Sequence, residues 1–177
     1  MADTLLFPYA NKLLTCLCDA ALANSSDLYP APGICCLRAG ESVALDITDA
    51  QVDECCLGLA YVRIDNFYPT GSAGAGFPSP SSDFALNACA PYAWGLQMEM
   101  AIWRCLVTPT TCDNWNYAAQ RQLLDAKTMR EALCCFMSQL DPQSVSVTPW
   151  QAKGPEGGCL GGTMNVTVMV ENCEGCT

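Results

Sequence analysis

Residues 93–106 read AWGLQMEMAIWRCL, and this stretch decides the fold. From Leu96 to Ile102 every second residue is large and apolar, whereas the residues from Gln97 to Trp103 on the opposite side are of mixed character. A period of two is that of a β-strand, in which successive side chains point to opposite faces. We therefore predict a long strand here, with one face buried in a core and the other face mixed.

The rest of the chain supplies further strands and two helices. Apolar residues that recur every three or four positions predict the helices, and shorter alternating runs predict the other strands. The predicted helices cover Leu5–Ala23 and Asp113–Leu140, and the predicted strands cover Ile34–Leu37, Leu57–Phe67, Ala93–Leu106, Val145–Thr148 and Met164–Glu171. This order predicts one α+β domain over residues 1–177, an antiparallel sheet with two helices packed on one face.

The second predicted helix is the best-defined element. Asp113 or Asn114 is expected to cap it, and Pro142 to stop it. Apolar residues at helical spacing predict a continuous buried stripe along its whole length. The stripe consists of Trp115, Ala119, Leu123, Ala126, Met129, Leu133, Phe136 and Leu140. Asp125 falls off this stripe, so we expect it to be a solvated or interface charge, as we do for Glu99 of the strand.

The charge balance argues against several functions. Eighteen acidic against eight basic residues give a net charge of −10, and the basic residues form no patch. Tight binding to nucleic acid draws on Lys and Arg, so it is not expected, although an acidic wall would let DNA slide past without adhering. The chain has no histidine, which removes the usual general base and the usual metal ligand. We expect no catalytic residue and no cofactor.

Fourteen cysteines are the least ordinary feature of the composition. Six of them form the doublets Cys35-Cys36, Cys55-Cys56 and Cys134-Cys135, whose side chains diverge and chelate poorly, so a zinc site is not expected. Two interpretations stay open: most cysteines are free and buried, or several form disulfides. In the second case the last strand would bring Cys173 or Cys176 near the end of the long helix, within reach of Cys134 or Cys135.

Four segments carry a resemblance to a known family. They are MADTLLFPYANKLL at residues 1–14, CCLGLAYVRIDNFYPT at 55–70, WGLQMEMAIWRC at 94–105 and WQAKGPEGGCLGGTMNVTVMVE at 150–171. With the element order and the acidic balance, they make the chain resemble the tail-terminator proteins of long-tailed bacteriophages, most of all those of phages of actinobacteria. The resemblance spans almost the whole chain and rests on no single diagnostic motif.

The resemblance implies a non-enzymatic virion protein. Such proteins form a ring, usually of six subunits, that caps the head-proximal end of the tail tube, stops its polymerisation and joins it to the neck or stopper protein, while DNA passes through the central hole. The implied place is the tail–head junction of a virion assembled in the cytoplasm of a bacterial host. The acids that we expect to line the channel are Glu41, Asp46, Asp49, Asp53 and Glu54. The loop residues that we expect between subunits are Phe77, Pro78, Lys153 and Glu156.

Three alternatives are kept. The chain could be another neck or tail-tube subunit of the same virion. The cysteine count favours a disulfide-stapled extracellular binding module, although Asp3 stands where a secretory signal carries basic residues, and no apolar run reaches the ~18–20 residues of a membrane span. An enzyme would draw on Cys112, just before the long helix, because a helix N-terminus activates thiols.

Overall fold

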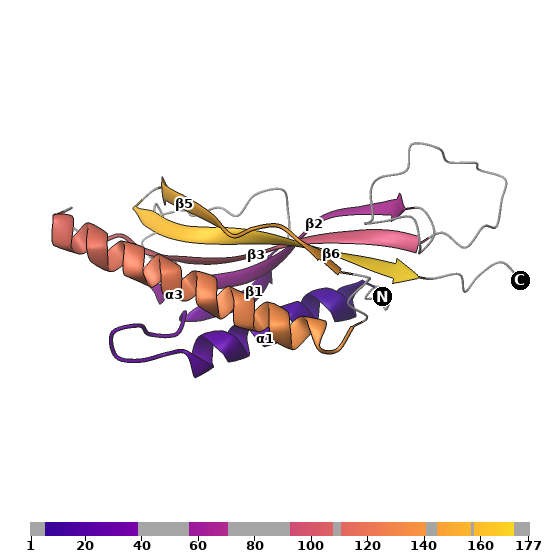
Figure 1. The fold of residues 1–177 in the computed structure, drawn as a ribbon, viewed down its shortest axis with the longest axis horizontal. Helices are drawn as coiled ribbons and strands as arrows, with labels where there is room; N and C mark the ends of the chain where they lie inside the picture. Colours follow the sequence, from indigo (N-terminus) through magenta and orange to yellow (C-terminus); the bar gives the residue numbers. More distant parts are fainter. Residues whose placement is uncertain are drawn as a thin grey trace, which may run out of the picture.

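The computed structural model describes residues 6–38, 57–70, 93–107, 111–140, 145–156 and 158–171. This part of the chain forms two helices and six strands (Figure 1). In chain order they are α1 (Phe7–Ala23), β1 (Ile34–Arg38), β2 (Leu59–Thr70), β3 (Ala93–Cys105), α3 (Cys112–Met137), β4 (Val145–Val147), β5 (Gln151–Glu156) and β6 (Cys159–Glu171). Every predicted helix and strand is present, and β5 is an additional strand.

The six strands form one sheet in the order β1-β2-β3-β6-β4, with β5 also paired to β6. Its middle strand β3 pairs with β2 and β6 in antiparallel register along its length. The predicted α+β class is confirmed, but β1 runs parallel to β2, so the sheet is mixed and not antiparallel throughout. A parallel neighbour needs a crossover connection, and the chain between Arg38 and Leu59 is long enough to make one.

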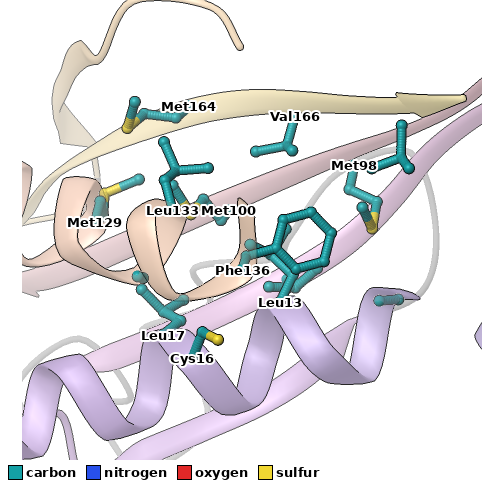
Figure 2. Close-up of a cluster of buried hydrophobic side chains, with 14 of the residues drawn as sticks. Leu13, Cys16, Leu17, Met98, Met100, Met129, Leu133, Phe136, Met164 and Val166 are labelled. Atoms are coloured by element: carbon teal, nitrogen blue, oxygen red, sulfur yellow. The ribbon is translucent and has the colours of Figure 1, made fainter. Parts of the chain in front are cut away.

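Both helices pack on one face of the sheet, as predicted (Figure 1). On that face Leu96, Met98, Met100 and Ile102 are fully buried, which confirms the alternation predicted for β3. In Figure 2, Phe136 of α3 and Leu13 of α1 lie together in the layer between the helices and β3. Burying one side chain of this size stabilises the fold by roughly 1.5–3 kcal/mol, so this layer is the main core.

The opposite face of the sheet is more buried than the sequence predicts. A second, smaller apolar cluster lies there, made of Leu59, Tyr61, Ala101, Trp103 and Cys159. The predicted start of β2 at Leu57 is wrong by two residues, because Gly58 takes a φ of 79° that turns the chain immediately before the strand. Leu57 is consequently 54% exposed.

The buried stripe of α3 differs from the predicted one. Thr111 caps the helix, and its hydroxyl accepts a hydrogen bond from the backbone N–H of Asn114. The C-terminal half follows the prediction, whereas Trp115 and Leu123 are 41% and 68% exposed. The buried residues are Ala118, Asp125, Thr128, Met129, Ala132, Leu133 and Phe136. The buried face of the helix therefore includes Asp125, and Leu123 lies outside it.

The final hairpin is longer than predicted. β4 pairs with β6 in antiparallel register as expected, but β6 begins at Cys159 and not at Met164, and β5 lies in the segment between the two predicted strands. Gly162 permits the close packing at this edge, since a Cβ there would lie 2.3 Å from the indole ring of Trp150. Within the described residues, β6 is the single strand neighbour of β5, so β5 forms an edge of the sheet.

Candidate functional site

Arg104 and Asp125 form an ion pair between the sheet and α3. Arg104 shares a side of β3 with the apolar residues up to Ile102, so its side chain enters the layer under the helices. Its Nε lies 2.9 Å and 3.1 Å from the two carboxylate oxygens of Asp125. The exposed fractions of the two residues are 3% and 1%. A charge buried to this degree requires a partner, and each residue supplies the other's.

The connection between α1 and β1 completes this network. The Tyr29 hydroxyl donates to Asp125 Oδ1 and lies 3.4 Å from Thr128 Oγ1. Arg104 Nη1 donates to the carbonyl oxygen of Pro30 at 2.8 Å, and its guanidinium carbon lies 4.3 Å from the centre of the Tyr29 ring. Three elements distant in sequence thus meet around one carboxylate, an arrangement that fixes their relative positions.

The protonation behaviour of the network follows from its burial. Burial raises the pKa of Asp125, against the lowering effects of the Arg104 charge and the Tyr29 hydrogen bond. Burial also raises the pKa of Tyr29 to about 12, and the negative charge of Asp125 acts in the same direction. Tyr29 is therefore a neutral hydrogen-bond donor throughout the physiological range. Both oxygens of Asp125 are already engaged, which is typical of a structural lock.

A small half-open pocket, with room inside for about one water molecule, adjoins the ion pair. Its wall includes Arg104, Tyr117, Arg121, Gln122 and Leu160. The guanidinium of Arg121 lies 5.4 Å from the centre of the Tyr117 ring, and the Tyr117 hydroxyl donates to the carbonyl oxygen of Leu28. Burial lowers the pKa of Arg121, and the nearby charge of Arg104 lowers it further. The pocket therefore brings two cations together.

A second polar group lies on the opposite face of the sheet. The Tyr61 hydroxyl donates to Glu99 Oε1 at 2.8 Å, and Arg63 Nη2 lies 3.3 Å from the same oxygen and 3.2 Å from Asp65 Oδ1. Burial raises the pKa of Tyr61, with a further contribution from the Glu99 charge. Glu99 is therefore a paired charge. Because it lies on the other face from Asp125, the two carboxylates do not form an acid–base pair.

Among the described cysteines the structure favours the disulfide interpretation, since none of the free thiols is buried. Of those described, six are disulfide-bonded: Cys16, Cys18, Cys35, Cys105, Cys135 and Cys159. Cys16 pairs with Cys135 and joins α1 to α3, while Cys18 pairs with Cys35 and joins α1 to β1. Cys105 and Cys159 lie opposite each other in the β3–β6 register. The thiols of Cys36, Cys112 and Cys134 are free.

The predicted pairing at the end of the long helix is wrong for Cys134 and Cys135. Cys135 faces α1 and is bonded to Cys16, and Cys134 is a free thiol on the exposed side of α3. Adjacent helical residues point about 100° apart, so just one member of the doublet can face α1. Cys173 and Cys176, proposed as their partners, lie outside the described residues.

The other predicted site residues fall into two groups. Lys153 and Glu156 lie on β5, where Glu156 is exposed and the Lys153 carbonyl accepts a hydrogen bond from Gln122 of α3. The remaining residues lie outside the described part of the chain, namely Glu41, Asp46, Asp49, Asp53, Glu54, Phe77 and Pro78. Cys112, the thiol considered for an enzyme, is exposed at the first residue of α3. No metal-binding group of three or more His, Cys, Asp or Glu residues occurs within the described ranges.

One side of α3 exposes apolar residues. Trp115, Ala119 and Leu123 lie along it, and all three are exposed. Gln122, which points about 100° away from Leu123 around the helix, donates to the carbonyl oxygens of Lys153 and Gly161, so the side of the helix that adjoins this ridge lies beside β5 and β6. We call Trp115, Ala119 and Leu123 together with β5 the α3–β5 surface. An apolar ridge next to a sheet edge is a common feature of protein–protein contacts.

Sequence reasoning missed Arg104, Arg121 and Tyr29, and the solvated or interface position expected for Asp125 is wrong, because Asp125 is buried against Arg104. Two signals could have found the central pair. Arg104 lies two residues after Ile102, so its side chain belongs to the buried face of β3. A charge on that face needs an acidic partner. Asp125 lies four positions before Met129, a spacing that places both residues on the same face of a helix.

The fold and these sites define a single-domain α+β protein with a buried ionic lock and an exposed apolar flank. No model of a known protein family matches the chain, and no curated protein matches it either. Neither described helix is sufficiently long and apolar to span a bilayer.

Proposed function

We propose that this chain is a non-enzymatic virion protein, the ring-forming tail terminator of a long-tailed bacteriophage. In this role it caps the tail tube and joins it to the neck around the DNA channel. Its partners are copies of itself in a ring of six, the tail-tube protein and the neck or stopper protein. Another neck or tail-tube subunit of the same virion is the nearest variant of this proposal.

The observation that carries the proposal is the α3–β5 surface. Leu123 is 68% exposed and Trp115 41% exposed, although both belong to an apolar stripe that helical spacing would bury. Large apolar side chains aligned on one flank cost solubility unless a partner covers them. The adjacent β5 adds the unpaired backbone groups of an edge strand, and Pro155 within it limits indiscriminate strand pairing.

The position of this surface suits a ring. In the described part of the chain, β1 forms one edge of the sheet, and β4 and β5 form the other. A contact between two different edges is heterologous, and repeated contacts of this kind close into a ring when the rotation between neighbours permits. The α3–β5 surface of one copy would then meet the β1 side of the next copy.

The acidic balance suits a channel for DNA. The net charge is −10, so six copies would carry about −60. An assembly with that charge repels the phosphate backbone, which lets a duplex slide without adhering. This support comes from the total charge of the chain, because the acids proposed for the channel lie outside the described residues.

The substitution Leu123→Glu, made in the chain that the host cell produces during particle assembly, tests the proposal. A carboxylate on the apolar ridge should block ring closure while the subunit still folds, because Leu123 is exposed in the monomer. Leu22→Glu on α1 is the matched control, since Leu22 is 67% exposed and belongs to the other helix. Electron microscopy of the lysate gives the result.

With Leu123→Glu we expect heads without tails and tubes of irregular length, and with Leu22→Glu we expect complete particles. Complete particles from both variants would show that the α3–β5 surface is not an assembly contact. Equal defects from both would show that any acid on the surface is harmful, which also contradicts the proposal.

A second candidate is a disulfide-stapled extracellular binding module, favoured by the six disulfide-bonded cysteines. Disulfides are rare in the cytoplasm, so a virion protein would acquire them after release from the host. Alkylation of thiols in intact producing cells separates the two candidates. A tail terminator should be reduced in the cell and oxidised in released particles, whereas a secreted module should be oxidised and found outside the cell without particles.

A further inference from the structure

The pocket beside the ion pair contains unsatisfied cationic donors. Arg104 Nη2 and Arg121 Nε are buried, and neither has a hydrogen-bond partner among the described residues. Arg104 itself is 3% exposed and lines the pocket together with Arg121. A buried donor without a partner costs the free energy of its lost hydration, more so when it is charged. Two such donors at one pocket point to a missing acceptor.

Within the part of the chain that the structure describes, the local charge is not balanced. Arg104 and Arg121 contribute two positive charges, and Asp125 contributes one negative charge that Arg104 and Tyr29 already engage. No carboxylate of the described residues forms an ion pair with Arg121. The pocket is thus a cationic spot on a chain of net charge −10. Water could accept the two hydrogen bonds, but it would leave the two like charges facing each other.

The geometry points to a binding site for one small oxyanion, a carboxylate or a phosphate, held between Arg104 and Arg121 at the mouth of the pocket. Guanidinium groups bind such anions through paired, charge-assisted N–H donors. The Arg104 guanidinium is fixed by Asp125 and Pro30, and that of Arg121 lies beside the Tyr117 ring, so both are ordered before the anion arrives. The anion removes the repulsion between them and satisfies both orphan donors.

The observations behind this site are independent of the proposed ring. The site needs neither a second copy of the chain nor any residue outside the described part. Inorganic phosphate and acetate are suitable probes, because they separate a tetrahedral anion from a carboxylate.

Calorimetric titration of the purified full chain with each probe, in chloride at matched ionic strength, tests the inference. Arg121→Gln is the test variant, since it removes the charge and keeps an amide, and the Arg104–Asp125 pair stays intact. Arg130→Gln is the control, because Arg130 is exposed on the same helix. Arg121→Gln should weaken anion binding about 10- to 100-fold, the factor for losing one charge-assisted hydrogen bond, and Arg130→Gln should leave it unchanged.

Binding of phosphate alone identifies a tetrahedral anion, binding of acetate alone identifies a carboxylate, and binding of both identifies general oxyanion recognition. Each of these results supports the site, provided that Arg121→Gln alone weakens the binding. The inference is overturned if neither probe binds wild-type protein, if chloride replaces them at equal concentration, or if the two variants behave alike.

Discussion

At the scale of single residues, Arg104 and Asp125 illustrate a charge pair that orients a helix. The carboxylate oxygens of Asp125 accept hydrogen bonds from the Arg104 Nε and the Tyr29 hydroxyl. The face of α3 that carries Asp125 must therefore lie against the sheet. Leu123, two positions earlier and about 200° away around the helix, then points outward. One buried acid thus determines which apolar residues are left on the surface.

Asp125→Asn tests the energetic role of this pair. Because the substitution leaves the Arg104 charge buried without a counter-charge, we expect the free energy of unfolding to fall by about 3–5 kcal/mol. The double substitution Arg104→Met with Asp125→Leu should recover most of that loss, since it removes both charges together. Urea unfolding measures both effects. An unchanged stability for Asp125→Asn would mean that Asp125 is already neutral in the folded protein.

The raised pKa of Tyr29 predicts how the stability of the fold changes at alkaline pH. Its pKa rises from 10.0 to about 12 on folding, so its contribution to stability is fully present below pH 10 and is lost between pH 10 and about 12. We expect Tyr29→Phe to be less stable at neutral pH and to lose less stability across that alkaline window. Urea midpoints across the window, measured with the free thiols blocked, check this. An identical alkaline slope in wild type and Tyr29→Phe would contradict the assignment.

At the scale of elements, the disulfide between Cys16 and Cys135 joins the two helices on one face of the sheet. The bonded residues are 119 positions apart, so the bond constrains a long segment of the unfolded chain. The neighbouring thiol of Cys134 is free and exposed. In this doublet Cys135 forms a structural disulfide, and we expect its neighbour Cys134 to be dispensable for stability.

Cys135→Ser and Cys134→Ser form a matched pair of variants. The loss of a loop of roughly 100 residues should cost Cys135→Ser about 4–5 kcal/mol on the chain-entropy account, whereas Cys134→Ser should change stability by less than about 0.5 kcal/mol. Denaturant unfolding without reductant measures the difference, and adding reductant should remove most of it. Equal stabilities without reductant would show that the Cys16–Cys135 bond is not formed in solution.

How far the sequence predicted each element depended on whether local spacing decides it. The face of β3 that carries Leu96 and Met98 was predicted, because strand alternation depends only on neighbouring residues. The parallel pairing of β1 and the partner of Cys135 were not, since both depend on how distant elements lie side by side. The outward turn of Leu123 was missed because a spacing rule for apolar residues gives no weight to a buried charge such as Asp125.

At the scale of the whole molecule, the sheet has two different edges, and both helices cover one of its faces (Figure 1). One edge, at β5, lies beside the exposed apolar flank of α3. This asymmetry favours head-to-tail association over a two-fold dimer, because the two contacting surfaces are not alike. It is the physical basis of the proposed ring.

A cryo-electron microscopy reconstruction of the tail–head junction tests the ring most directly. We expect copies of this chain in a closed ring at the head-proximal end of the tail tube, with Trp115 and Leu123 of each copy buried against its neighbour. A junction that lacks this chain, or a ring in which the α3–β5 surface faces solvent, would contradict the account.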